Sequence, residues 1–266
     1  MKITLLLMGL NLKRAILCKS FVLSTIGTAL LILSGSSAAI FYQDFDGNWE
    51  IGGDILYGLT TGMQGSSGTP FAIVGILPLF VFSTTFAMEW QQRAINFWII
   101  RVGTTKYAIC KIIATAISAM LVTIVGFLLY GLILSFWLPL FSTFQTGNPF
   151  EPFLLAGRPM MYFIYFTLYF ALGSALCAVC GLGVSTMIPD KFTTIASPLV
   201  IYIIMVRLTS SPTIPEYLQA INLVEGIYSG STPFTTLFVK FVVILVLCSL
   251  MGVGIVGNIK RRLNNA

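Results

Sequence analysis

Long apolar runs separated by polar segments dominate the chain. Six runs approach the roughly 20 residues that an α-helix needs to cross the hydrocarbon layer of a membrane. They cover residues 21–41, 69–88, 112–137, 160–184, 192–208 and 235–257. Because a backbone in lipid must satisfy its own hydrogen bonds, runs of this length predict helices. The pattern therefore predicts an all-α polytopic membrane protein, with six transmembrane helices in a single domain of residues 1–266.

The composition supports this interpretation. Of the 266 residues, 57% are apolar and only 9% are charged, whereas about a quarter of the residues of a soluble domain are charged. The mean hydropathy is +0.93. A single soluble core cannot hide such an excess of apolar residues. We expect a multi-pass protein of a plasma membrane, such as the inner or cytoplasmic membrane of a bacterium.

The basic residues collect on one side of the predicted spans. Twelve of the fifteen lie there: Lys2, Lys13, Arg14, Lys19, Arg93, Arg101, Lys106, Lys111, Lys191, Lys260, Arg261 and Arg262. The positive-inside rule places this side in the cytoplasm, so both termini are predicted to be cytoplasmic. The net charge of +6 then reflects topology rather than nucleic-acid binding. Arg207 and Lys240 lie near the outer ends of their spans, where we expect them to reach the outer headgroups.

Two further helices are predicted outside the spans. Residues 1–20 alternate apolar clusters with Lys and Arg, which is typical of a helix lying in the inner membrane interface, although a frayed tail is the simpler alternative. Between the fifth and sixth spans, Thr213 and Glu216 form a capping-box pair. Apolar residues repeat there at helical spacing: Ile214, Tyr217, Leu218, Ile221 and Val224. We expect a short extracellular helix at this place.

The segment of residues 89–111, EWQQRAINFWIIRVGTTKYAICK, is the densest cationic stretch, with four basic residues and one acid. One helical face carries its apolar residues: Ala94, Ile95, Trp98, Ile99 and Val102. This pattern predicts a helix along the inner membrane surface, with apolar residues toward lipid or span ends. We expect Gly103, Thr104 and Thr105 to break it, and a new helix to begin at Lys106. The plain alternative is a loop whose cations only set the orientation of the chain.

Several kinds of active site are excluded or disfavoured. The chain has no His, which removes the usual general base and the commonest zinc ligand, so we predict no enzyme, no catalytic residues and no metal site. The sequence GVGIVG at residues 252–257 matches a dinucleotide fingerprint, but it lies in an apolar run without a preceding strand. We expect a close-packing helix face there. No phosphate-binding G-x-x-x-x-G-K-[ST] motif occurs, so this chain is expected to bind no cofactor itself.

The layout E…RVGTTKYAICK in residues 89–111 resembles the loop after the second span in ATP-binding-cassette (ABC) transporter permeases of the type-2 exporter family. The positions that carry the resemblance are Glu89, Arg101, Gly103, Lys106, Tyr107 and Lys111. The chain length, the six predicted spans, the inside termini and the helical excursion before the last span also resemble that family.

The resemblance implies that residues 89–111 are a coupling segment that docks into a separate ATPase subunit. The docking residues would be Glu89, Arg93, Ile95, Trp98, Ile99, Arg101, Lys106 and Lys111. A second coupling loop would lie around residues 188–192, with Asp190 and Lys191. ATP and Mg would be bound by a dimer of that nucleotide-binding subunit, and ATP hydrolysis would not occur on this chain.

The resemblance also implies a permease that exports an amphiphile, such as a peptide, an antibiotic or a lipid-like molecule. Two permease chains would pair in the bilayer, as a homodimer or a heterodimer. Aromatic residues that could line the pathway are Phe71, Phe80, Phe82, Phe86 and Tyr202, with core packing or lipid contact as the equal alternative. A different functional hypothesis is a non-transporting membrane scaffold or immunity protein that binds a partner. An ATP-independent carrier or channel is the third hypothesis.

Overall fold

Helices account for nearly all of the regular structure. The structure, a computed structural model, describes residues 2–43, 49–64, 69–140 and 146–264. Within these residues, six helical segments are long and apolar enough to cross a membrane: Lys19–Ser37, Thr69–Gln91, Thr104–Leu134, Pro159–Met187, Lys191–Thr209 and Pro233–Asn264. The prediction of a helical protein with six candidate spans is therefore confirmed.

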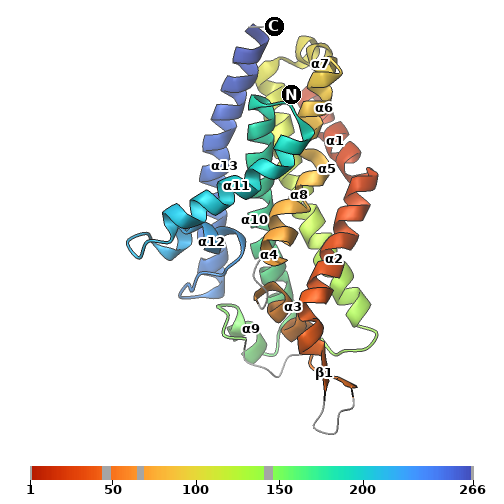
Figure 1. The fold of residues 1–266 in the computed structure, drawn as a ribbon, viewed down its shortest axis with the longest axis vertical. Coiled ribbons are helices and arrows are strands. Elements are labelled where there is room, and N and C mark those ends of the chain that lie inside the picture. Colours follow the sequence, from red (N-terminus) through yellow and green to blue (C-terminus); the bar gives the residue numbers. More distant parts are fainter. Residues whose placement is uncertain (1, 44–48, 65–68, 141–145, 265–266) are drawn as a thin grey trace.

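One end of the bundle, here called the α7 end, holds three segments that are far apart in the sequence. They are α1 (Lys2–Ile16), α7 (Ala94–Val102) and the last turns of α13 (Pro233–Asn264), as Figure 1 shows. Contacts agree with this arrangement, because Leu7 of α1 and Ile259 of α13 belong to one buried apolar cluster. The two ends of the described chain therefore lie on the same side of the bundle.

The opposite end of the bundle is built from short elements. They are β1 (Phe41–Gln43), β2 (Trp49–Ile51), α3 (Ile55–Gln64) and α9 (Glu151–Leu155). The two strands form an antiparallel hairpin that pairs Phe41 with Ile51. This hairpin, which the sequence pattern did not predict, is the one departure from an all-helical fold among the described residues.

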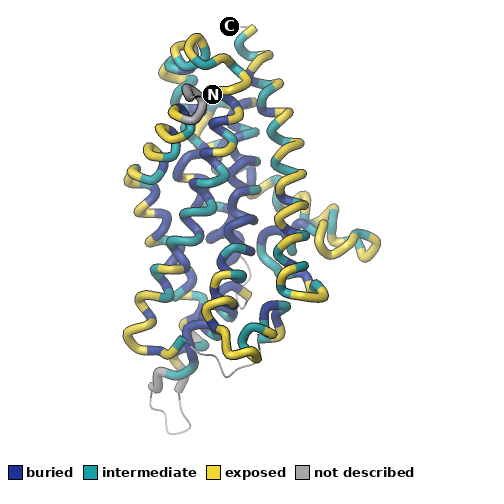
Figure 2. The backbone as a smooth tube through the Cα atoms, turned by 180° about the vertical axis from the view of Figure 1, so that it is seen from behind, coloured by how far each residue is buried: buried dark blue, intermediate teal, exposed yellow. Residues whose placement is uncertain are grey.

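The centre of the bundle is α10 (Pro159–Met187), which packs against α8 (Thr104–Leu134), α13 and the second span. Of its apolar window, 72% is buried, against 11% for α11 (Lys191–Thr209). Figure 2 shows buried residues along the bundle axis, and in Figure 1 α11 leads away from that axis toward the side of the bundle. The main core thus forms around α10, while α11 is peripheral. The first span, α2 (Lys19–Ile40), packs against α8 and α3.

The second span is broken into pieces, where the sequence pattern predicted one run over residues 69–88. The pieces are α4 (Thr69–Phe71), the π-helical turn η1 (Ala72–Ile76), α5 (Leu79–Phe82) and α6 (Thr85–Gln91). Pro78 has no N–H, so it cannot donate to the preceding turn. The Leu77 N–H instead donates to the Ala72 oxygen five residues back, at 3.0 Å.

Helix α3 was not predicted, because its apolar run, between the first two predicted spans, is too short to cross a membrane. Its residues Ile55, Leu56, Leu59 and Met63 are fully buried or nearly so. The helix approaches α2 closely, since a Cβ built at Gly62 would lie 2.9 Å from the backbone oxygen of Ile32. A helix too short to span the bilayer therefore becomes part of the core by packing backbone to backbone.

The predicted extracellular helix is present only as two short pieces, η2 (Glu216–Leu218) and α12 (Ala220–Val224). Gln219 between them has extended backbone, with ψ 129°. Thr213 does not cap η2, because Pro215 occupies the N-cap position and makes no side-chain capping bond. Instead, the Asn222 amide donates to the Glu216 oxygen at 3.0 Å and joins the two pieces.

Two expectations about α13 need correction. Lys240 does not reach the outer headgroups: it is 1% exposed, and its Nζ lies 3.4 Å from the ring centroid of Tyr169 on α10. The GVGIVG run is not a close-packing face throughout, because a Cβ built at Gly254 or Gly257 would meet nothing within 4 Å. Both errors arise from the rotation of α13 about its axis, which the sequence pattern does not define.

Candidate functional site

The segment predicted to be a coupling element is almost entirely helical. Glu89 lies in the last turns of α6, and α7 begins at Ala94 after Arg93, the one described non-glycine residue with positive φ, at 56°. Gly103, with φ 85°, lies between α7 and α8. Its N–H donates to the Ile99 oxygen of α7 at 2.8 Å, and its oxygen accepts a hydrogen bond from the Tyr107 N–H of α8 at 3.0 Å. The predicted three-residue break is thus one residue, and α8 begins at Thr104 rather than at Lys106.

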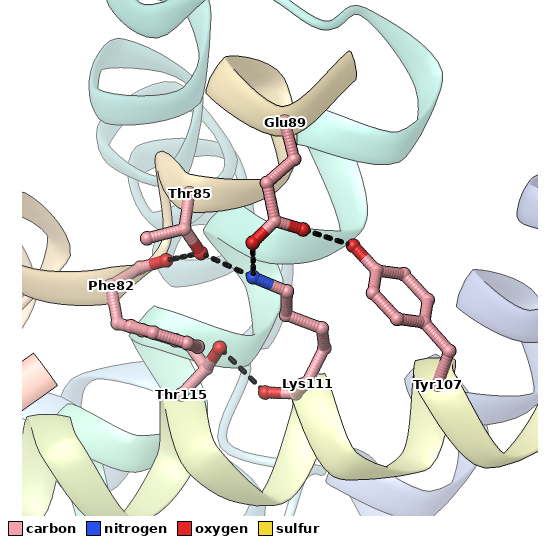
Figure 3. Close-up of polar contacts among 6 residues, drawn as sticks. All are labelled: Phe82, Thr85, Glu89, Tyr107, Lys111 and Thr115. Carbon is pink, nitrogen blue, oxygen red and sulfur yellow. Dashed lines mark hydrogen bonds and ion pairs between the residues drawn. The ribbon is translucent and has the colours of Figure 1, made fainter. Parts of the chain in front are cut away.

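A buried polar network ties α6 to α8 beside α7 (Figure 3). The Lys111 ammonium lies 2.8 Å from Glu89 Oε1 and donates to Thr85 Oγ1 at 3.1 Å. The Tyr107 hydroxyl donates to Glu89 Oε2 at 2.5 Å, so both carboxylate oxygens are bound. The ammonium also lies 4.6 Å from the Phe82 ring centroid. Charges this well hidden from solvent are stable only when paired and hydrogen-bonded, and here both are.

One face of α7 is held against the protein. Ile95 is 1% exposed and belongs to the same buried cluster as Leu7, Phe86 and Tyr107. Trp98 is half-buried, and the Arg14 guanidinium of α1 lies 5.5 Å from its ring. The predicted apolar face is therefore real, but it packs on α1 and on span ends. Ile95 is not available to an external partner.

The opposite face of α7 is exposed and partly apolar. Phe97 is 54% exposed and Ile100 is 85% exposed. Arg101 is also exposed, and its guanidinium lies 4.1 Å from the Phe97 ring. Phe97 and Ile100 were not among the predicted docking residues, although their spacing of three residues, opposite Ile95, places them together on a helix. Arg93, just before α7, is exposed as well.

The second predicted coupling loop lies against the first. The Gln91 amide donates to the Pro189 oxygen at 3.1 Å, and this contact joins the end of α6 to the turn between α10 and α11. Arg262 of α13 donates to the Met187 oxygen and lies 5.2 Å from the Trp90 ring. The two loops and the last turns of α13 thus form one surface at the α7 end.

Asp190 has a local structural role in that second loop. It is the N-cap of α11, where its Oδ2 accepts hydrogen bonds from the Thr193 N–H at 3.0 Å and the Thr193 hydroxyl at 3.1 Å. These hydrogen bonds hold the pKa of the Asp190 carboxyl below its ordinary value. Lys191, Lys106 and Arg101 are exposed at the same end of the molecule, whereas Lys111 is buried.

The aromatic residues proposed to line a pathway do not share one surface of the chain. Phe71 and Tyr202 stack on each other with centroids 4.4 Å apart. Phe82 and Phe86 are buried, Phe82 against the Lys111 ammonium and Phe86 against the Trp90 ring. Phe80 is 43% exposed. Among these five aromatic residues, Phe71 and Tyr202 form the one ring pair that joins the second and fifth spans.

Among the described residues, no three His, Cys, Asp or Glu side chains are grouped closely enough to hold a metal ion. Comparisons of the chain with protein-family models, with curated proteins and with solved structures find no match. The geometry around α7 is therefore the main basis for a functional proposal.

Proposed function

We propose that this chain is the membrane-spanning permease subunit of an ABC transporter, and that it exports an amphiphile with ATP hydrolysed by a separate subunit. The proposal rests on α7, a short helix at the end of the bundle that packs against the protein with one face and exposes the other. Because residues 89–111 resemble the coupling segment of such permeases, we interpret the exposed face of α7 as the docking site for the ATPase subunit.

The exposed face of α7 has the chemistry of a protein-docking surface. Phe97 and Ile100 offer apolar area, and Arg101 stacks beside Phe97 with its guanidinium at the surface. Aromatic and Arg side chains are the residue types that most often dominate the free energy of protein association. A groove on an ATPase subunit would cover these side chains and exclude water from them.

Because one face of α7 packs against the protein, a movement of α7 can be transmitted to the spans. Only Gly103 separates α7 from α8, and Glu89 is bound by Lys111 across the base of the loop. A displacement of α7 by a partner would therefore move α6 and α8 together, as a rigid element moves when it is packed against its neighbours. The contact of Gln91 with Pro189 extends the same surface toward α10 and α11.

The experiment is affinity purification of the full chain from its native membranes in mild detergent, with co-purifying proteins identified by mass spectrometry. We expect an ATPase with a phosphate-binding loop in the wild-type complex. Replacement of Phe97, Ile100 and Arg101 by Ala should reduce its recovery about tenfold or more, because these side chains would form the centre of the interface.

The matched control is the pair Phe136→Ala and Trp137→Ala just beyond α8, whose side chains are 76% and 67% exposed. This pair removes exposed aromatic area elsewhere on the chain and should leave ATPase recovery unchanged. If no ATPase co-purifies with the wild-type chain, or if the α7 variant retains it fully, the coupling role is wrong. A scaffold or immunity protein would then be the better description.

A further inference from the structure

An apolar groove of about 680 Å³ lies between α8 and α13. Ile109, Ile113 and Ile117 line it from α8, and Gly252, Val253 and Val256 line it from α13. Ser249 is one of the few polar lining residues, and its hydroxyl already donates to the Leu245 oxygen of its own helix at 2.7 Å. The groove therefore presents hydrocarbon along nearly its whole length and suits an aliphatic ligand.

Two lysines continue the rows of residues by which α8 and α13 line the groove. Lys106 lies three residues before Ile109 and seven before Ile113, on the same face of α8. Lys260 lies four residues after Val256 and seven after Val253, on the same face of α13. Both side chains are exposed. Each helix thus carries one cation directly beyond the apolar lining.

The two lysines lie at similar depth. Ile112 and Gly252 mark a common level, because a Cβ built at Gly252 would lie 3.5 Å from Ile112 Cδ1. α8 runs away from the α7 end and α13 runs toward it. With a rise of 1.5 Å per residue, Lys106 is about 9 Å and Lys260 about 12 Å from that level, both toward the α7 end. The groove therefore ends between two cations.

The length of the groove matches one leaflet. From Leu245 to Val256 the lining of α13 covers 11 helical steps, or roughly 16 Å, which is about half of the ~30 Å hydrocarbon thickness of a bilayer. A groove of this length would run from the headgroups at the α7 end to the middle of the membrane. An acyl chain in that leaflet has the same extent.

The charges of Lys106 and Lys260 are not paired within the described part of the chain. Among the described residues the one ion pair joins Lys111 to Glu89, so Lys106 and Lys260 make none. Of the acids that the structure describes at the α7 end, Glu89 is bound by Lys111 and Tyr107, and Asp190 caps α11 through Oδ2. Both lysines are therefore open to an anionic group such as a phosphate.

We propose that this groove is a binding site for an anionic glycerophospholipid of the leaflet at the α7 end. One acyl chain lies between the isoleucines of α8 and the valines of α13, and the phosphate lies between Lys106 and Lys260. Basic residues at the edge of an intramembrane groove favour anionic over zwitterionic headgroups. The site does not depend on an ATPase partner and goes beyond the proposed export function.

The test is native mass spectrometry of the full chain in detergent, titrated with dioleoylphosphatidylglycerol or with dioleoylphosphatidylcholine. We expect tight occupancy by the anionic lipid and weaker occupancy by the zwitterionic one. The double variant Lys106→Gln/Lys260→Gln should bind phosphatidylglycerol about tenfold more weakly. The charge-matched control Lys13→Gln/Lys19→Gln removes two exposed cations of the same end outside the groove and should bind it like the wild type.

A second pair of variants tests the groove itself. Gly252→Leu places a side chain in the groove at ordinary contact distance from Ile112 and should lower lipid occupancy, whereas Gly257→Leu, with open space around it, should not. Equal binding of the two lipids, or equal loss in the lysine variant and its control, would overturn the proposal. Dissociation of a dimer in the Gly252→Leu variant would also overturn the proposal, since a second copy of the chain would then occupy the groove.

Discussion

The Lys111 ammonium and the Glu89 carboxylate lie 2.8 Å apart, with 2% and 15% of their side chains exposed. This ion pair closes the base of the segment that carries α7. We expect Glu89→Gln to lower the free energy of unfolding by about 3 kcal/mol, because it leaves a buried ammonium without its counter-charge.

The double variant Glu89→Gln/Lys111→Met removes both charges and should recover most of that loss. Thermal unfolding of the purified chain in detergent, measured for both single variants and the double variant, gives the coupling between the two residues. Additive losses, with no recovery in the double variant, would mean that the two side chains do not stabilise one another.

Lys240 and Tyr169 provide a second buried contact, with the ammonium 3.4 Å from the ring centroid and no hydrogen-bond partner for Nζ among the described residues. We expect Lys240→Met to leave stability unchanged or to raise it, because it replaces an ammonium without a hydrogen bond by an apolar chain of similar length. Tyr169→Leu should cost about 3 kcal/mol in the wild type, since it removes a large buried ring.

In the Lys240→Met background, Tyr169→Leu should cost about 1–2 kcal/mol less, because the cation–π contact is already absent. Tyr169→Phe serves as the control, since it keeps the ring and loses only the hydroxyl that donates to the Asn222 oxygen at 3.1 Å. A thermal-unfolding cycle with no coupling between Lys240 and Tyr169 would contradict this account.

Gly62 and Gly35 allow α3 to lie against α2. A Cβ built at Gly35 would lie 2.8 Å from the Gly62 oxygen, so neither residue has room for a side chain. We expect Gly62→Ala to lower the free energy of unfolding by about 1–3 kcal/mol through overpacking. Gly254→Ala on α13 is the control, because nothing lies within 4 Å of its built Cβ.

Hydrogen exchange of α3 and α2 shows whether the destabilisation of Gly62→Ala is local. Exchange should increase in α3 and in the facing turns of α2, and remain unchanged in α13. If Gly62→Ala and Gly254→Ala behaved alike, the close backbone approach would not exist.

The Asp190 cap predicts a pH dependence at the start of α11. Its folded-state pKa is lowered from the ordinary value of 3.8, chiefly by the hydrogen bond from the Thr193 N–H. A lowered pKa stabilises the folded state above that ordinary value, and the contribution disappears as the pH falls through the folded-state pKa. At neutral pH, Asp190→Ala should therefore increase hydrogen exchange at residues 193 and 194, whereas Asp190→Asn should preserve most of the protection.

Much of the fold was predictable from periodicity and length. Six runs of sufficient hydrophobicity define six helices, because the bilayer requires backbone hydrogen bonds to close within each span. The α7 helix was also predicted from the sequence, since an apolar stripe with basic residues beside it is visible at a spacing of three and four residues. Glu89 and Lys111 were named through the resemblance of residues 89–111 to a coupling segment. The broken second span was not predicted, although Pro78 marks where it breaks.

The sequence by itself determined which segments are long and apolar enough to span a membrane and where the cations collect, because both follow from the composition of contiguous stretches. Only the tertiary structure decided which face of each helix is buried. It turned Lys240 toward Tyr169, buried Ile95 while exposing Phe97 and Ile100, and brought apolar faces of α8 and α13 together around one groove. These outcomes depend on how helices rotate and pack against one another, and nearly uniform apolarity around a span leaves that rotation undefined in the sequence.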